Sequence, residues 1–140
     1  MQQLRLHIER LRTSGLRPTK QRLALCKILF DRKETFHFTI EKLKQIVDRN
    51  SKKKISLATL YNTVHAFKRN GYLKEISLKG NKTFFDTNTK NHYHFYDEDT
   101  SQLIDINNEN IQLKNLPDAP NTKKIKEVEI IVRIENNYQK

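Results

Sequence analysis

The chain has 140 residues, one cysteine, no tryptophan and a formal net charge of +11. The single cysteine, Cys26, excludes an internal disulfide and any zinc site built from Cys-x-x-Cys pairs. No apolar run approaches the length of about 18 residues that a membrane-spanning helix needs, and the N-terminus has no signal-peptide core. We therefore expect a soluble, cytoplasmic protein that does not enter a membrane.

The positive charge is unevenly distributed. Residues 1–90 carry 21 Lys and Arg against 7 Asp and Glu, a net of +14, whereas residues 91–140 carry 6 against 9, a net of −3. An AT-rich genome would explain many Lys and Asn residues, but it would not explain the acidic second part. The asymmetry therefore predicts a module that binds a polyanion, joined to a part with another role.

Apolar residues recur at helical spacing in four stretches of the first part. They predict helices over residues 2–13, from Pro18 to Phe30, from Thr39 to Arg49 and from Ser56 to Arg69. Thr19, Thr39 and Ser56 suit N-caps, and Pro18 suits a first helical turn. We expect Gly71 to end the fourth helix in the left-handed conformation, and we expect Thr35–Phe38 and Ser51–Lys54 to be connections.

The fourth helix has the face that DNA reading needs. Its predicted buried stripe and its predicted outer face each contain four residues: Leu57, Leu60, Val64 and Phe67 inside, and Thr59, Asn62, Ala66 and Arg69 outside, with Tyr61 on the flank. Short side chains, an amide and an aromatic ring suit the base edges and thymine methyls of the major groove. A solvated amphipathic helix is the alternative.

A predicted hairpin follows this helix. Tyr72–Leu78 and Thr83–Thr87 read as strands, with a turn at residues 79–82 between them. Helices that end in a recognition helix and are followed by a hairpin describe a winged helix-turn-helix, whose wing is the hairpin. The fold class is therefore α+β, with a winged-helix DNA-binding domain at residues 1–87 and a polar linker at 88–91.

Residues 92–140 predict a small α/β dimerisation domain. Its predicted strands are His92–Tyr96, Ser101–Ile106, Ile111–Leu113 and Lys126–Ile134. About 50 residues can hardly bury a sufficient core alone, so we expect this domain to pair with a copy of itself. A homodimer would present two recognition helices to two halves of a double-stranded DNA operator.

Five candidate metal ligands lie in this pattern. They are His37, Asp86, His92, His94 and Asp105. Imidazole and carboxylate donors without a thiolate suit Fe(II), Mn(II) or Zn(II). The His92–His94 pair shares one face of a strand, although two surface histidines there are also common, and spacing alone does not unite the other three with it.

Two histidines and one aromatic cluster have simpler explanations. His7 and His65 are expected to be solvated or capping side chains. Tyr93, Phe95 and Tyr96 are expected in the core or rim of the dimerisation domain, with a flat ligand such as haem as the alternative.

Three segments, Leu16–Arg22, Ser56–Thr63 and Gly80–Asp86, together with the histidine strand, resemble motifs of the ferric uptake regulator (Fur) family in order. The resemblance covers about Leu16 to Ile134. Within the family, the chain resembles the iron response regulators (Irr). The segments that indicate this are residues 85–88, 92–96, 102–106, 116–120 and 128–134.

The resemblance implies roles for particular residues. It places His37, Asp86, His92, His94 and Asp105 at one metal site between the two domains. It implies that Arg17 reaches the minor groove and that Tyr61 and Asn62 contact bases. The full set of DNA-binding candidates is Arg17, Thr19, Arg22, Ser56, Thr59, Tyr61 and Asn62.

The chain also departs from the family pattern. Asp97 and Thr100 stand where most relatives have the first cysteine pair of a structural zinc site, so we expect no such zinc. In the iron response regulators, a run of three histidines is associated with haem sensing. This chain keeps only His92 and His94 of that run. Haem is therefore an alternative effector beside the metal.

The resemblance implies a dimeric repressor or activator of iron and haem homeostasis that is not an enzyme. A peroxide sensor of the same family is one alternative, because three His and two Asp at one iron form the ligand set with which such sensors oxidise their own histidine. A non-haem iron enzyme and a sequence-blind nucleoid protein are alternatives from other classes.

Overall fold

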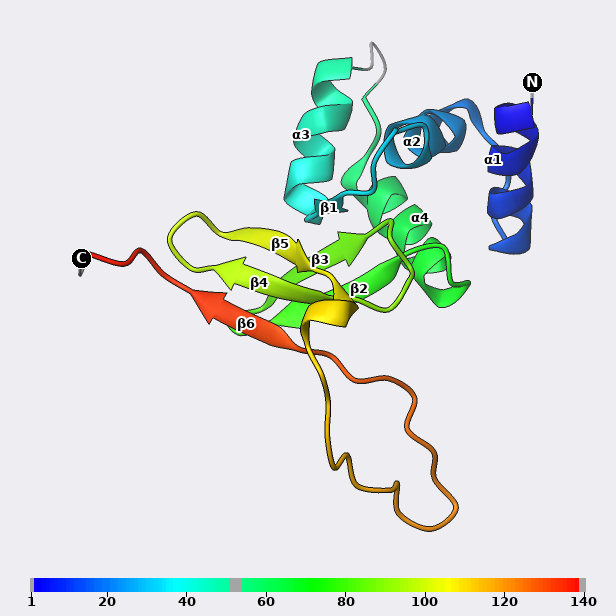
Figure 1. Cartoon of the computed structure of the whole chain (residues 1–140). Helices are drawn as coiled ribbons and strands as arrows, with labels where there is room; N and C mark the ends of the chain where they lie inside the picture. Colours follow the sequence, from blue (N-terminus) through cyan, green and yellow to red (C-terminus); the bar gives the residue numbers. More distant parts are fainter. Residues whose placement is uncertain (1, 51–53, 139–140) are drawn as a thin grey trace. The chain divides into compact units, whose positions relative to one another are not determined.

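The computed structural model describes residues 2–50 and 54–138, and it divides the chain into two compact units (Figure 1). The boundary falls between Thr89 and Lys90. We call them the N-terminal unit and the C-terminal unit. The described residues form four α-helices, one 3-10 helix and six strands, which confirms the predicted α+β class. The roles predicted for the two parts, DNA binding and dimerisation, stay predictions.

The four helices belong to the N-terminal unit. They are α1 Gln2–Thr13, α2 Lys20–Phe30, α3 Ile40–Asn50 and α4 Leu57–Arg69. No helix in the described part of the chain is long and apolar enough to cross a membrane. Residues 51–53 of the predicted basic turn lie outside the described residues.

Each of the last three helices begins at a hydroxyl side chain, as predicted. The hydroxyls of Thr19, Thr39 and Ser56 accept from backbone N–H groups at 3.3, 3.1 and 3.1 Å. An N-cap of this kind satisfies one of the first-turn donors that have no partner within the helix. Gly71 follows α4 with φ +81°, the left-handed conformation predicted for it.

A three-stranded antiparallel sheet completes the N-terminal unit. Strand β3 (Lys82–Asp86) lies between β2 (Lys74–Leu78) and β1 (His37–Phe38). The β2–β3 hairpin turns through Gly80 and Asn81, whose φ angles of +77° and +59° belong to the left-handed region. This hairpin is the predicted wing.

The C-terminal unit contains a second three-stranded sheet. Its central strand β4 (Tyr93–Asp97) pairs antiparallel with β5 (Gln102–Ile106) and parallel with β6 (Ile131–Ile134). The turn between β4 and β5 is held by Asp97, whose carboxylate accepts from the backbone N–H groups of Asp99 and Thr100 at 2.9 and 3.2 Å. The 3-10 helix η1 (Asn108–Asn110) follows β5.

Several predicted elements are wrong in extent. Pro18 precedes α2 instead of lying in its first turn, because Thr19 is the N-cap. The connection predicted at residues 35–38 contains β1, and Ile111–Leu113 forms no strand. Only Ile131–Ile134 of the strand predicted from Lys126 is a strand, although the Ile130 carbonyl still accepts from the His94 backbone N–H at 3.2 Å.

Burial corrects the predicted faces of α4 and the assignments of two histidines. Leu57 is 48% exposed and Ala66 is 1% exposed, the reverse of the prediction for each. Leu57 is the first residue of α4, whereas Ala66 lies near its end, where its carbonyl accepts from the side-chain amide of Asn70 at 2.8 Å. His7 is buried, not solvated: its Nε2 lies 2.9 Å from Asp31 Oδ1 and its Nδ1 is 3.0 Å from Arg10 Nη1. His65 packs between aromatic rings.

Candidate metal ligands and recognition helix

The five predicted metal ligands fall into two sets, one in each unit. His37 and Asp86, which we call the first ligand pair, belong to the N-terminal unit. His92, His94 and Asp105, which we call the second ligand group, belong to the C-terminal unit. Each set is described by itself.

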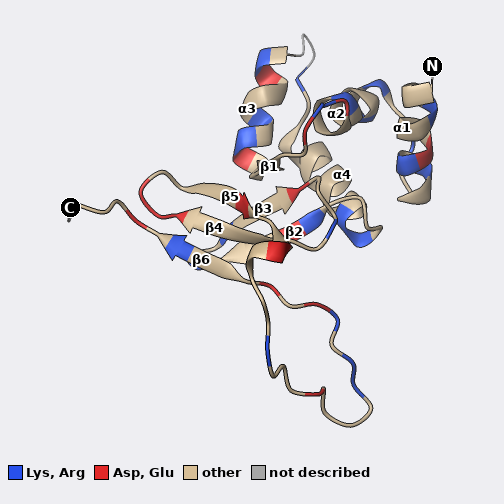
Figure 2. Ribbon diagram, in the orientation of Figure 1, with Lys and Arg blue, Asp and Glu red and all other residues tan. Residues whose placement is uncertain are grey.

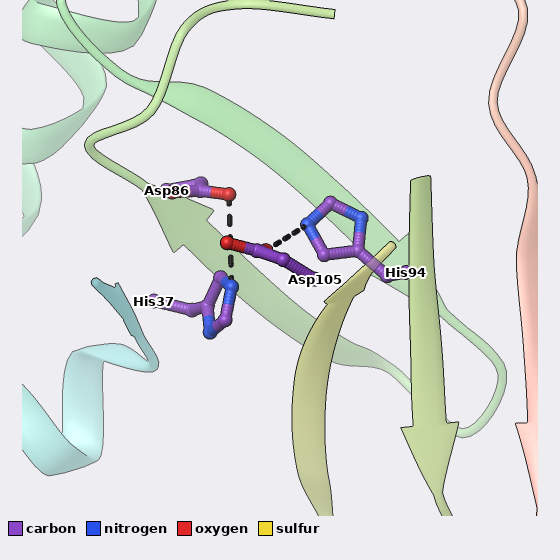
Figure 3. Close-up of side chains that lie close together, drawn as sticks. All are labelled: His37, Asp86, His94 and Asp105. Atoms are coloured by element: carbon purple, nitrogen blue, oxygen red, sulfur yellow. Dashed lines mark ion pairs between the residues drawn. The ribbon is translucent and has the colours of Figure 1, made fainter. Parts of the chain in front are cut away.

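The first ligand pair is assembled by strand pairing. His37 of β1 stands directly opposite Asp86 of β3, so the two side chains share one face of the sheet. His37 Nε2 lies 3.8 Å from Asp86 Oδ2 (Figure 3). The second oxygen of Asp86, Oδ1, accepts from the Asn88 backbone N–H at 2.8 Å, which orients the carboxylate. The Asp86 carboxylate is fully buried. Because an unpaired buried charge is costly, a cation beside this carboxylate would be stabilising.

The second ligand group is assembled in the same way. His94 of β4 pairs with Asp105 of β5, and His92 lies two residues before His94, on the same face. His92 Nε2 and His94 Nε2 both lie 3.3 Å from the same oxygen, Asp105 Oδ1. Figure 3 draws the His94–Asp105 pair with a dashed line.

A backbone carbonyl decides which nitrogen of His92 carries its proton. His92 Nδ1 lies 2.7 Å from the carbonyl oxygen of Lys90, which can only accept a hydrogen bond. Nδ1 is therefore the donor, and Nε2 is the nitrogen that faces Asp105 Oδ1 at 3.3 Å. A proton or a metal cation can lie between this nitrogen and the carboxylate oxygen.

The separations fit two donors on one ion. Metal–nitrogen and metal–oxygen bonds of about 2.0–2.2 Å place adjacent donors roughly 2.8–3.1 Å apart in octahedral geometry and roughly 3.3–3.6 Å apart in tetrahedral geometry. The 3.3 Å distances of the second ligand group agree with the tetrahedral range, and the 3.8 Å distance of the first ligand pair exceeds it slightly. The donor set of imidazole and carboxylate suits Fe(II), Mn(II) or Zn(II).

The predicted DNA-binding residues lie at the starts of two helices. Arg17 is exposed before α2, and the guanidinium of Arg22 donates to its carbonyl at 3.2 Å. Thr19 and Ser56 serve as N-caps, and the hydroxyls of Ser56 and Thr59 lie 2.9 Å apart. These hydroxyls thus have a structural role besides the one predicted for them.

Tyr61 and Asn62 remain available to a partner. Both are exposed on α4, Tyr61 at 41%. Lys and Arg residues follow the helices of the N-terminal unit in Figure 2, and α4 itself ends with Lys68 and Arg69. An exposed amide and aromatic ring on a basic unit are the groups that base contacts and phosphate contacts require.

The family is decided by sequence. A model of the ferric uptake regulator family matches residues 13–134. The chain belongs to the ferric uptake regulator family. The peroxide-responsive repressor PerR of Staphylococcus aureus (strain Mu50 / ATCC 700699) is 34% identical over 99 residues, which cover 71% of this chain and 65% of the relative. The chain thus spans 65% of the length of such curated relatives.

Solved structures show the same fold. The ferric uptake regulator of Vibrio cholerae superposes with a TM-score of 0.69 at 20% identity, over 92% of this chain and 98% of that one. The manganese-containing ferric uptake regulator of Pseudomonas aeruginosa gives 0.66 at 16% identity, over 94% and 98%. These identities support the fold alone.

Sequence reasoning missed three contributors. The backbone groups of Lys90 and Asn88 orient His92 and Asp86, and no side-chain pattern reports a backbone partner. The stacking of His65 on Tyr61 is the third: a solvated or capping side chain is expected there, although His65 follows Tyr61 by four residues and helical spacing places the two rings on one face.

Proposed function

We propose that this protein is a metal-responsive, DNA-binding regulator of transcription that acts as a homodimer on double-stranded DNA, and not an enzyme. The observation that carries the proposal is the second ligand group. His92 is held by the Lys90 carbonyl so that its Nε2 faces Asp105 Oδ1, an arrangement in which a bound metal cation would have two donors. The family supports the assignment, since its members in the comparisons are named uptake regulators and repressors.

DNA binding is supported by charge and exposure. Residues 1–90 carry a net charge of +14, and α4 exposes Tyr61 and Asn62. We propose that Arg17, Thr19, Arg22, Ser56 and Thr59 position the protein on phosphates or in the minor groove, while Tyr61 and Asn62 read bases. Selection of duplexes from a random pool tests this, because a sequence-blind nucleoid protein would enrich no motif.

We infer that one ion takes donors from both ligand sets. His37 and Asp86 would bind it from the N-terminal unit, and His92, His94 and Asp105 from the C-terminal unit. When bound, the ion supplies a fixed link between the units. In a dimer, that link would favour one spacing of the two recognition helices, and the ion would shift the population toward it.

Calorimetric titration with Mn(II) and Zn(II) tests the shared ion. A shared site predicts one ion per chain, and both His37→Ala and His94→Ala should weaken that same binding event. Asp105→Ala should weaken the same event, and its control is Asp48→Ala, which removes a carboxylate on α3 paired with Lys44 and should bind as the wild type does. Equal metal affinity in the wild type and His94→Ala would rule out this site.

The effector class has two candidates. Regulation of iron and haem homeostasis is supported by the resemblance to the iron response regulators. Peroxide sensing is supported by the relative named peroxide-responsive repressor, at 34% identity, and by the ligand set of three His and two Asp. In that case, bound Fe(II) would react with peroxide, and a ligand histidine of this chain would be oxidised.

Peroxide treatment separates these two candidates. We load the protein with Fe(II) or with Mn(II), add hydrogen peroxide, and measure operator binding and the mass of the histidine peptides. A peroxide sensor loses DNA binding only with Fe(II) and gains one oxygen atom on a ligand histidine. An iron or haem regulator keeps binding, and a parallel titration shows whether haem displaces Mn(II) from His92 and His94.

A further inference from the structure

A row of aromatic rings connects the recognition helix to the strand pair that carries the first ligand pair. Tyr61 and His65 of α4 stack with ring centroids 5.8 Å apart and planes inclined by 10°. His65 then meets the edge of Phe85 at 5.7 Å and 86°. Phe85 stacks on Phe38 at 5.8 Å, with planes inclined by 28°.

The inner end of this row is buried. Phe38 and Phe85 are each 1% exposed, and they face each other across the β1–β3 pair. Their neighbours His37 and Asp86 also pair, and side chains alternate along a strand, so ligands occupy one face and the two phenylalanines the other. Figure 1 shows α4 beside these strands in the N-terminal unit.

The outer end of the row is the exposed ring of Tyr61. A 41% exposed tyrosine on a helix surface ordinarily samples several rotamers, which weakens any contact that needs one orientation. Here the His65 ring lies nearly parallel to the Tyr61 ring, and His65 also contacts the buried ring of Phe85. The arrangement prepares Tyr61 in one orientation before a partner arrives.

We propose that His65 is a positioning residue for base recognition: it stacks on the Tyr61 ring and links that ring to Phe85, in the strand pair that carries His37 and Asp86. The proposal rests on the proposed function, because it assumes that Tyr61 contacts bases. His65 itself touches no base and no ion in this proposal. Its contribution is the flat ring, which an aliphatic side chain of similar size cannot supply.

Three substitutions at one position separate stacking from packing. His65→Phe keeps a ring, His65→Leu keeps apolar volume without a ring, and His65→Ala removes both. Tyr72→Leu is the matched control, because Tyr72 makes a similar edge contact with Phe67 on α4, at 6.0 Å and 83°, away from Tyr61. Thermal unfolding confirms that each variant is folded before it is used.

The first readout needs no DNA. In the metal-free protein, NMR of tyrosine ring carbons and protons reports the ring-current shift that a stacked neighbour causes. We expect the Tyr61 signals to stay displaced in the wild type, His65→Phe and Tyr72→Leu, and to move toward exposed-tyrosine values in His65→Leu and His65→Ala. Unchanged Tyr61 signals in His65→Leu would overturn the proposal.

The second readout is sequence discrimination, measured as the affinity ratio between a duplex selected by the wild type and its scrambled version. We expect His65→Leu and His65→Ala to lose about threefold to tenfold of this ratio, the scale of one aromatic contact, and His65→Phe to retain it. In a Tyr61→Ala background, His65→Leu should cause no further loss. A loss that persists there, or a His65→Phe variant as poor as His65→Ala, would overturn the positioning role. A wild type that selects no duplex would instead contradict the proposed function, while the NMR result would still report the stacking.

Discussion

The two units differ in how well each covers its own apolar residues. The N-terminal unit buries a continuous cluster contributed by all four helices and the sheet, in which Leu11, Leu25, Leu43, Leu60 and Phe67 are all fully buried. The C-terminal unit buries four hydrophobic residues, Tyr93, Tyr96, Leu103 and Ile106, among the residues described. It leaves five aliphatic side chains at least 37% exposed: Ile104, Leu113, Leu116, Ile125 and Val132.

This difference indicates where each unit obtains its stability. A unit with a closed core is stabilised by its own packing, whereas a small sheet with exposed aliphatic residues needs a partner surface. Strand β6 lies at the edge of the sheet order β5-β4-β6, so its outer backbone groups are available for pairing. The comparison therefore supports the proposed homodimer through the C-terminal unit.

The largest expected effect is on the core of the N-terminal unit. Phe67→Ala removes a fully buried ring that touches Phe30 and Tyr72, and we expect it to lower the free energy of unfolding by about 3–5 kcal/mol. Ile104→Ala, at a residue 45% exposed in the C-terminal unit, should change the stability of the separate chain by less than about 0.5 kcal/mol. Urea unfolding measures both changes. Similar losses of stability for the two variants would contradict the claim that only the N-terminal unit is stabilised by its own core.

The next effect concerns the dimer. Val132→Asp places a charge on the edge strand where a partner would bury it, and we expect the dimer dissociation constant to rise at least about 100-fold, or roughly 2.7 kcal/mol. Ile130→Asp should act in the same direction. Arg133→Ala, at an exposed neighbour, is the control. Sedimentation over a range of concentrations measures the change, and a wild type that binds operator as a stable monomer would contradict the proposal.

Base discrimination gives a smaller effect that is confined to the N-terminal unit. Asn62→Ala should lose roughly 1–3 kcal/mol of preference for the selected duplex and keep its non-specific affinity, because the amide contacts base edges and not phosphates. Arg17→Ala should weaken binding most at A·T-rich flanks, where a narrow minor groove attracts arginine. Competition binding at fixed salt measures both. Equal weakening of all duplexes by Asn62→Ala would place α4 outside the groove.

The reactivity of the Cys26 thiol measures how well the N-terminal core excludes solvent, and it is the prediction with the smallest effect on stability. Burial raises the pKa of Cys26 from 9.0 to about 12, with Arg10 opposing and Asp31 reinforcing that shift. The native thiol should therefore react with iodoacetamide about a thousandfold more slowly at pH 8 than the unfolded thiol does. Because the folded pKa exceeds the unfolded value, the thiol favours the folded state below pH 9, and this stabilisation is lost as pH rises toward 12.

A matched thiol in the C-terminal unit completes this test. Leu103→Cys in a Cys26→Ala background places the thiol in the smaller core, where we expect faster modification than at Cys26. Equal modification rates in the two units would show that the C-terminal unit is as closed as the N-terminal one.

Acidification supplies an independent check on the ligand sets. Protons compete with the ion for imidazole nitrogens, so metal affinity should decrease as the pH is lowered.

The sequence determined the local elements whose signals are local. Hydroxyl residues at Thr19, Thr39 and Ser56 marked the starts of three helices, and Gly71 marked an end, because capping depends on residues within one turn. The wing was equally visible, since a glycine and an asparagine that accept positive φ stand between two alternating stretches. The five candidate ligands could be named from residue type, but spacing alone did not group them, and only the family resemblance did.

The tertiary structure decided what depends on pairing between distant segments. Strand β1 forms because His37 and Phe38 pair with β3, about fifty residues later in the chain. Two residues alone are too short to show the alternation that predicts a strand. That pairing brings His37 to Asp86, and the pairing of β4 with β5 brings His94 to Asp105. Helical periodicity gave Leu57 and Ala66 a direction on α4, but only the packed structure determined which of the two is buried, and it placed His65 against Phe85 of β3. Burial is set by what lies opposite a side chain, and what lies opposite comes from another part of the chain.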